Sequence, residues 1–272
     1  MLRWLGLPVA IAHVEIDETP RPGEPPAELA ARLAVEKARA AQGDGWVLTA
    51  DTVVELDGRN APDPEVDAAT GTWVLTADTV VELDGRMLDK PAGAAEARAT
   101  LEALRGRRHL VHTAVALARA EAEAGPGPRA SRPHAPVLGR TSGCGRTPVR
   151  GRTPVLGRVR RVTTEVQMRA YTDAEIDAYI ATGDPLDKAG AYAIQHPTFA
   201  PVAHLHVCYA NVVGLPLCAV LTLIESVIRT PSEARNPNAF RGAQSAIPNV
   251  PSLCLRHFNY DCPAPDIGEA RP

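Results

Sequence analysis

Short clusters of polar and charged residues interrupt segments that otherwise have the composition of a protein core. These clusters are Asp17-Glu18, Lys37, Thr76-Ala77-Asp78-Thr79, Asp89-Lys90-Pro91, and Asp187-Lys188-Ala189-Gly190 followed by Gln195. Asp78 stands within a run of β-branched residues, where a carboxylate is costly to bury unless it is paired or used. Carboxylates can hold Mg²⁺ or Mn²⁺ and take a proton from water, and lysines can neutralise the charge of a phosphate chain. The set therefore indicates metal-assisted chemistry on a phosphate substrate.

Each of these residues, taken alone, also has a plain structural explanation. Leu29, Leu33 and Lys37 fall at i, i+4 and i+8 of a predicted helix, so Lys37 lies at the edge of the core, where its ammonium could snorkel to water. An Asp in a strand is more often a turn or edge residue, and Lys188 is more often solvated. The prediction depends on the whole set.

A duplicated segment leaves two candidates for the carboxylate in the strand. Residues 46–59 and 73–86 both read WVLTADTVVELDGR, so Asp51 is the equivalent of Asp78. Two identical copies without a third favour a tandem duplication over a repeat architecture. The second copy continues through the turn signal Asp84-Gly85 to Lys90, and a hairpin fixes register while a helix-to-strand loop tolerates insertion. We therefore expect the second copy, with Asp78, in the catalytic position.

The apolar periodicity predicts alternating helices and strands around these residues. Helices are predicted over residues 25–43, 94–105 and 172–183 and from 216 onward, and strands over residues 73–83, 110–118 and 162–168. Thr172 and Glu175 have the spacing of a capping box, and Gly43 and Gly183 are stop signals. The alternation is typical of an α/β domain.

Two segments lack this periodicity. Residues 121–157 form a low-complexity insert rich in Arg, Gly and Pro, and residues 230–272 form a proline-rich tail in which we expect little regular structure. The expected organisation is one domain over residues 1–229, which includes the duplicated segment 46–72 and the insert. The arginines between 129 and 161 suggest a nucleic-acid arm as an alternative, but no aromatic residues alternate with them, so a solvated loop is favoured.

Composition narrows the class of protein. The chain has 272 residues, 45% of them hydrophobic, which is enough for a real core, and its net charge of −3 indicates no polyanionic partner. The five cysteines are scattered and form no CxxC pair, which argues against a disulfide framework or a zinc site and favours a cytoplasmic location. Arg3 and Ala10-Ile11-Ala12 imitate a short signal peptide, but we favour a helix end leading into a strand. No membrane contact is expected, because the best apolar run contains Pro216 and Glu225.

The ordered motifs resemble those of the Maf family of nucleoside triphosphate pyrophosphatases. They are HVEIDETPRPGEPP with LAVEKARA, TADTVVELDGRMLDKP, LRGRRHLVHTAVAL, TDAEIDAYIATGDPLDKAGAYAIQ and YANVVGLPL. The resemblance implies an α/β fold with an elongated, twisted mixed sheet flanked by helices and two lobes around a cleft, similar to inosine triphosphate pyrophosphatase. It also implies hydrolysis of a nucleoside triphosphate to the monophosphate and pyrophosphate with a divalent metal, Mg²⁺ or Mn²⁺.

The resemblance assigns roles to the polar clusters. It implies that Asp78, or Asp51 in the other copy, is the general base. It also implies that Thr79, or Thr52 in the other copy, sets the specificity for dTTP and UTP together with Gln195. It further implies that Glu18 and Asp78 hold the metal. The cleft lysines that would bind the substrate are Lys37, Lys90 and Lys188.

The chain also departs from the family's pattern. Members open with a strand and a Ser-Pro-Arg-Arg loop that grips the phosphates, and this sequence begins after that point, so we expect either an upstream start or a decaying gene. Asp89 and His196 stand where the family usually has glycine. The expected partner is the nucleoside triphosphate substrate, with a second copy in a homodimer as a further candidate and nucleic acid not expected. The alternative function is that of an inactive relative that acts by binding in cell-division arrest.

Overall fold

A single mixed sheet runs through the molecule and carries the residues singled out above. The computed structural model describes residues 10–11, 14–41, 46–50, 72–120, 154–228, 254–256, 258 and 260. Within them, seven strands form one sheet in the order β1-β2-β3-β5-β6-β7, with β4 paired to β3. The strands are β1 Ala10–Ile11, β2 Trp46–Ala50, β3 Thr72–Leu83, β4 Arg86–Leu88, β5 Arg108–Ala120, β6 Pro154–Met168 and β7 Val202–His206. Strands β1, β2 and β3 are parallel and the other pairs are antiparallel, which confirms the predicted mixed sheet.

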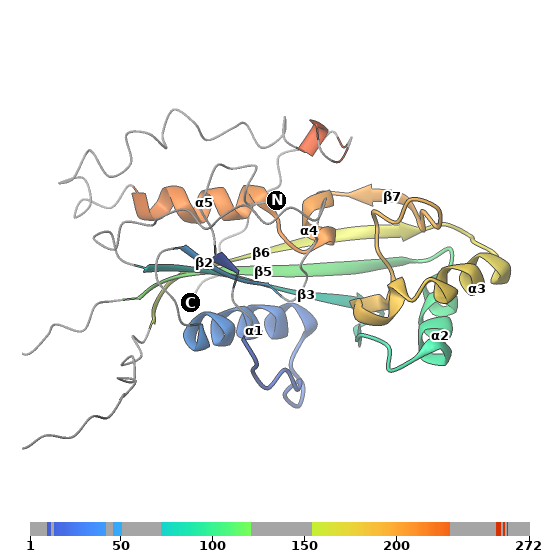
Figure 1. Cartoon of the computed structure of the whole chain (residues 1–272), viewed down its shortest axis with the longest axis horizontal. Helices are drawn as coiled ribbons and strands as arrows, with labels where there is room; N and C mark the ends of the chain where they lie inside the picture. The colour runs from blue at the N-terminus through green and yellow to red at the C-terminus, as the bar shows by residue number, and fades with distance from the viewer. Residues whose placement is uncertain are drawn as a thin grey trace, which may run out of the picture.

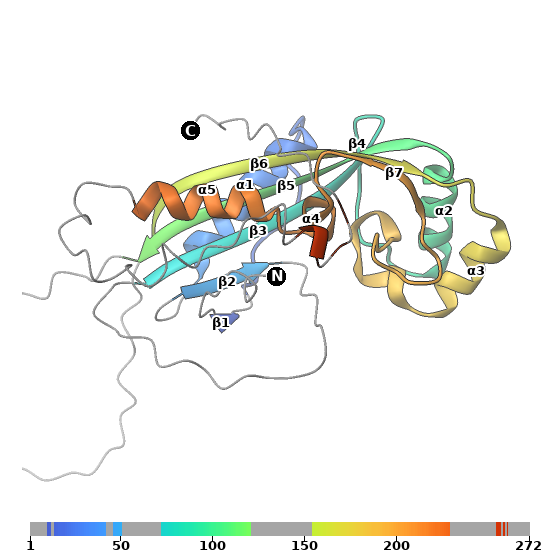
Figure 2. The same ribbon diagram turned by 90° about the horizontal axis from the view of Figure 1, so that it is seen from above.

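Helices cover both faces of the sheet at one end and gather around it at the other. The helical segments are α1 Pro26–Ala40, α2 Ala94–Leu104, α3 Asp173–Ala181, η3 Asp184–Asp187, η4 Ala189–Ala191, α4 Tyr209–Val213 and α5 Leu217–Ile228. Figure 1 shows α1 and α5 on opposite faces of the long strands, with α2 and α3 at the far end. Figure 2 shows β3, β5 and β6 running from one lobe to the other. The predicted two-lobed α/β architecture is thus confirmed.

The alternation of side chains along β3 distributes them between the two faces. Trp73, Leu75 and Ala77 pack in the cluster under α5, whereas Val74 and Val80 pack in the cluster under α1. From Val81 onward the strand enters a third cluster, with α2 and α3. Residues 78–81 therefore lie where the two lobes meet.

Local sequence determines where helices α1 and α3 begin. Helix α1 begins after Pro25 with Pro26 in its first turn, where a missing N–H costs nothing. Helix α3 begins at the predicted capping box, in which Thr172 Oγ1 accepts from the N–H of Glu175 and the Glu175 carboxylate accepts from the N–H of Thr172.

Both copies of the duplicated segment contribute to the sheet. The second copy forms β3, between β2 and β5, and the start of the first copy forms β2, so residues 46–72 are not simply an inserted loop. The two strands are parallel with identical residues opposite each other, from Trp46 opposite Trp73 to Ala50 opposite Ala77. Identical β-branched sequences have the same preference for strand, so one copy can pair beside the other. Asp51 lies outside the described residues.

The insert ends earlier than predicted, and part of the tail packs against the domain. Strand β6 begins at Pro154, so residues 154–157 belong to the sheet, while residues 121–153 lie outside the part of the chain described. In the tail, residues 254–256 and 258 are helical, and Cys254 is buried in the α5 cluster with Phe258 and Tyr260 packed against it. The described part of the tail therefore contains one short helical segment that packs against the domain. Among the described helices, none has the length and apolar character needed to cross a membrane.

Candidate active site

A buried ammonium joins two carboxylates on the α1 face of the sheet. Lys37 Nζ lies 2.6 Å from Asp78 Oδ1 and 2.9 Å from Glu18 Oε1. The side chains of Lys37 and Asp78 are each 4% exposed, whereas that of Glu18 is 47% exposed. Lys37 therefore does not snorkel to water, and its charge is balanced inside the protein. The structure brings together three of the residues that the sequence singled out.

The meeting of Lys37 and Asp78 is fixed by the packing of α1 on β3. Leu29, Leu33 and Lys37 lie on the buried face of α1, as their spacing predicts. One turn before Lys37, the carbonyl of Ala34 accepts a 2.6 Å hydrogen bond from the buried hydroxyl of Thr76. Since Thr76 and Asp78 share a face of β3, this bond sets Lys37 over Asp78.

The segment that carries Glu18 is held to α1 by one arginine. Arg32 Nε and Nη2 lie 2.7 and 2.9 Å from the two carboxylate oxygens of Glu24, and Nη2 also donates to the carbonyl of Thr19 at 3.0 Å. The hydrogen bond from Arg32 lowers the pKa of Glu24 to about 2, and the same bond raises the pKa of Arg32. Bidentate pairs of this kind restrict geometry as well as adding energy. Arg32 thus ties the residue next to Glu18 to the helix that bears Lys37.

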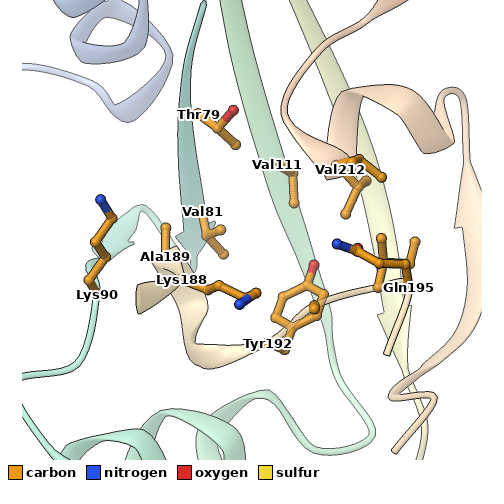
Figure 3. Close-up of a pocket in the computed structure, with 12 residues that line it drawn as sticks. Thr79, Val81, Lys90, Val111, Lys188, Ala189, Tyr192, Gln195 and Val212 are labelled. Carbon is orange, nitrogen blue, oxygen red and sulfur yellow. The ribbon is translucent and has the colours of Figure 1, made fainter. Parts of the chain in front are cut away.

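A pocket lies on the other face of β3. Its volume is about 530 Å³, including the solvent at its mouth. The pocket is lined by Thr79, Val81, Lys90, Val111, Lys188, Ala189, Tyr192, Ala193, Ile194, Gln195, Val212 and Val213. Figure 3 shows Thr79 and Val81 on β3 and Gln195 across the space from them, with its amide nitrogen directed inward. Four predicted substrate residues, Thr79, Lys90, Lys188 and Gln195, therefore share one cavity.

Lys188 is held in place by the acidic residues of η3. Its Nζ lies 2.7 Å from Asp187 Oδ1, 3.1 Å from Asp184 Oδ1 and 2.9 Å from the Asp184 carbonyl oxygen. Burial alone would lower the pKa of Lys188, but these hydrogen bonds outweigh it and the pKa is raised. Gly190, which follows in η4, has a φ of 72°, and a Cβ there would lie 3.0 Å from Val81 Cγ1. The loop therefore approaches β3 more closely than a larger residue allows.

The two groups of residues lie on opposite faces of β3 but next to each other along it. Asp78 faces α1, whereas Thr79 faces the pocket. In the described part of the chain, β2 pairs with β3 as far as Ala77, and β4 pairs from Val81 onward. Between them, residues 78–80 have no paired strand on this side among the described residues, whereas β5 pairs with them on the other side.

The carboxylates suit a divalent cation that is shared with a substrate. Within the described residues, no cluster of three or more His, Cys, Asp or Glu side chains could hold a metal alone. Asp78 and Glu18 nevertheless both contact the same atom, Lys37 Nζ, although they come from different parts of the chain. Mg²⁺ commonly takes one or two carboxylates together with substrate phosphates, so the two residues fit that mode of binding.

Comparison with known proteins identifies the family. The family model described as Maf-like protein matches residues 1–70, 60–132 and 147–227, and each of the first two segments contains one copy of the duplicated strand. The chain belongs to the Maf family. A dTTP/UTP pyrophosphatase of Anaeromyxobacter dehalogenans strain 2CP-1 is 37% identical over 224 residues, which is 82% of this Maf chain and 86% of the relative. A dTTP/UTP pyrophosphatase of Thermomicrobium roseum is 37% identical over 244 residues, 87% of this chain and 84% of the relative.

Sequence reasoning missed a buried pair at the base of the pocket of this Maf protein. His109 Nε2 lies 2.8 Å from the hydroxyl of Tyr192, which lines the pocket. His109 is 3% exposed, and burial lowers its pKa to about 4, so its ring is neutral at neutral pH. The sequence contains only one signal of this pair: His109 stands two positions before Val111, so the two side chains share a face of the strand. Tyr192 itself stands two positions before Ile194 in the AYAIQ motif.

Two further residues beneath the pocket were also missed. Thr113 and Asn211 are both 0% exposed, and Thr113 Oγ1 lies 2.9 Å from the hydroxyl of Thr79. Asn211 belongs to the short helix α4, where its side-chain amide donates to the carbonyl of Val111 at 3.0 Å. The partners of Asn211 lie far away in the sequence, on β5 and β6, so spacing could not reveal them.

Proposed function

We propose that this Maf protein hydrolyses dTTP and UTP to the nucleoside monophosphate and pyrophosphate. The observation that carries the proposal is the buried Lys37 ammonium shared by Asp78 and Glu18 at the edge of the pocket strand. The curated relatives named dTTP/UTP pyrophosphatase support the choice of substrate. We also propose that the protein works in the cytoplasm, on the evidence of its five scattered cysteines.

Asp78 acts as the general base in this proposal. It takes a proton from a water molecule whose oxygen attacks the α-phosphorus, and the bond from that phosphorus to the bridging oxygen breaks, so pyrophosphate leaves. The adjacent ammonium of Lys37 favours the ionised carboxylate, which is the form that accepts a proton. Glu18 and Asp78 are the residues that would hold Mg²⁺ or Mn²⁺, which supplies positive charge to the triphosphate.

The pocket residues bind and orient the nucleotide. Thr79 and Gln195 face the base across the pocket, between the apolar side chains of Val81 and Val212. Lys90 and Lys188 line the same cavity and bind the phosphate chain, with Lys188 held in place by Asp184 and Asp187. Positioning of this kind accounts for much of the rate enhancement in reactions at phosphorus.

The test is product analysis with the full chain. The purified protein is incubated with dTTP, UTP, dCTP, dATP or dGTP and either Mg²⁺ or Mn²⁺, and monophosphate, pyrophosphate and inorganic phosphate are measured separately. We expect equal amounts of monophosphate and pyrophosphate, fastest from dTTP and UTP. Stepwise release of inorganic phosphate would contradict the reaction, and binding of dTTP without turnover would support the inactive relative instead.

A further inference from the structure

The hydroxyl of Thr79 belongs to a chain of hydrogen bonds that extends into the protein interior. This chain determines whether the hydroxyl donates a hydrogen bond to a substrate or accepts one. Thr79 Oγ1 lies 2.9 Å from Thr113 Oγ1, and Thr113 Oγ1 lies 2.9 Å from the carbonyl oxygen of Asn211. Two oxygens at this distance need a proton between them, and each hydroxyl has one proton to give. The carbonyl has none, so the proton in the second contact belongs to Thr113. The proton in the first contact must then belong to Thr79.

We propose that Thr113 is a positioning residue that makes Thr79 a hydrogen-bond acceptor in the pocket, and thereby selects bases that carry an N3–H group. Thymine and uracil have a proton on N3, whereas cytosine has a lone pair there. An acceptor at Thr79 matches the first two bases and opposes the lone pair of the third. This inference rests on the proposed function and adds a source of base selectivity to it.

The surrounding network holds Asn211, whose backbone carbonyl accepts the proton of Thr113. The Asn211 side-chain amide donates to the carbonyl of Val111 at 3.0 Å and to Thr164 Oγ1 at 2.9 Å. Thr164 in turn donates to the carbonyl of Cys208 at 3.3 Å. Thr113, Thr164 and Asn211 are each 0% exposed, so water does not offer them other partners. Backbone carbonyls thus accept one proton each from Thr113, Thr164 and the Asn211 amide.

The other residues that line the pocket also suit the edge of thymine or uracil that carries N3–H. In thymine and uracil, N3–H is flanked by two carbonyl oxygens, which need donors. The Gln195 amide lies across the pocket from Thr79, with its nitrogen directed inward. Val81, Val111 and Val212 supply apolar walls without competing polar groups. A site built to pair one polar edge discriminates strongly against a base that leaves that edge unpaired.

The first test replaces Thr113 by valine, which keeps the shape and removes the hydroxyl. The Thr79 proton is then released and can donate to cytosine N3, so we expect the ratio of kcat/KM for dTTP to that for dCTP to fall by roughly tenfold. Thr113→Ser restores the hydroxyl and should restore the ratio. Thr164→Val is the matched control, because it removes a buried hydroxyl of the same network that does not touch Thr79. An unchanged ratio in Thr113→Val, or an equal fall in Thr164→Val, would overturn the inference.

A second test needs no variant and no turnover. Binding of dTMP, dCMP and 3-methylthymidine monophosphate to the unaltered protein is measured by calorimetry. We expect dTMP to bind at least about tenfold more tightly than the other two, which lack N3–H. If 3-methylthymidine monophosphate binds as tightly as dTMP, the inference fails even if Thr113→Val does not fold. If dTMP is preferred but no triphosphate is hydrolysed, the proposed function fails and the selectivity stands.

Discussion

Asp78 and Glu18 share one lysine but differ in their access to water. The carboxylate of Asp78 is almost fully buried beside Lys37, whereas about half of the Glu18 side chain is exposed. Removing one partner of a buried ion pair leaves an uncompensated charge, while an exposed carboxylate contributes much less to the pair. Asp78 also lies beside Thr79 in the strand, next to the pocket. These differences make Asp78 the stronger candidate for the general base.

Substitution of Asp78 by asparagine keeps the shape of the side chain and removes its basicity. We expect Asp78→Asn to lower kcat by roughly 100-fold or more, which is typical of a lost general base. The matched control is Asp51→Asn, the same substitution in the other copy, which should change kcat little. Thermal melts separate loss of chemistry from loss of folding. Equal losses in the two variants would show that either copy can serve.

The contact between Lys37 and Asp78 could be predicted only in part from the sequence. The spacing of Leu29, Leu33 and Lys37 predicts that the lysine shares the buried face of its helix, and the β-branched run places Asp78 in a strand. That the two side chains meet depends on tertiary packing, which no local pattern contains. Thr113 and Asn211 were missed for the same reason, since the two residues are 98 positions apart in the chain.

At the scale of elements, α1 and the segment before it act as one unit. Arg32 on α1 holds Glu24 and Thr19, and this places Glu18 beside Lys37. The folded-state pKa of Glu24 is about 2, below its ordinary value of 4.5. A carboxyl with a depressed pKa stabilises the fold above its unfolded-state pKa, and that contribution disappears as the pH falls from about 4.5 toward 2.

Replacement of Arg32 by methionine should release this segment. We expect the pKa of Glu24, measured by NMR titration, to rise toward 4.5, and the concentration of Mg²⁺ needed for half-maximal turnover to increase because Glu18 is no longer held. The loss of stability relative to the unaltered protein should be largest above pH 4.5 and should shrink at lower pH.

Arg21→Met is the matched control for this substitution. Arg21 forms an ion pair with Glu36, as Arg32 does, but the Arg21 side chain is 65% exposed, so its ion pair contributes little. The control should raise the Glu24 pKa much less than Arg32→Met does, because the charge of Arg21 is a smaller cause of the lowered pKa than the hydrogen bond from Arg32. It should leave the Mg²⁺ requirement nearly unchanged. A normal Mg²⁺ requirement in Arg32→Met would show that Glu18 is positioned without the arginine.

The elements themselves were predicted well where a local signal exists. The capping box at Thr172 and the hairpin at Asp84-Gly85 both appear in the structure, because short-range hydrogen bonds and turn geometry decide them. The pairing of β2 beside β3 was not predicted, because identical strands carry no information about which neighbour each will choose. The helical residues of the tail were missed because they are too few to show a period.

At the scale of the whole molecule, the long strands join two lobes, and the candidate site lies at their junction. Residues 73–80 of β3 pack with α1 and α5, and residues from Val81 onward pack with α2 and α3. The tail adds to the first lobe, since Cys254 is 1% exposed in the α5 cluster. Its aromatic residues reach Tyr209 at the start of α4, the helix that carries Asn211. The tail thus supports the helix beneath the pocket.

Truncation of Phe258 tests whether the tail belongs to the folded domain. The rings of Phe258 and Tyr209 have centroids 4.8 Å apart, and Phe258 also packs against the α5 cluster, so we expect Phe258→Ala to lower the free energy of unfolding by about 1–2 kcal/mol in urea titrations. Leu255→Ala is the matched control, because Leu255 lies in the same helical segment but is 54% exposed. The control should change stability by less than about 0.5 kcal/mol. Equal and small effects of both substitutions would mean that the tail does not stabilise the lobe that carries Asn211.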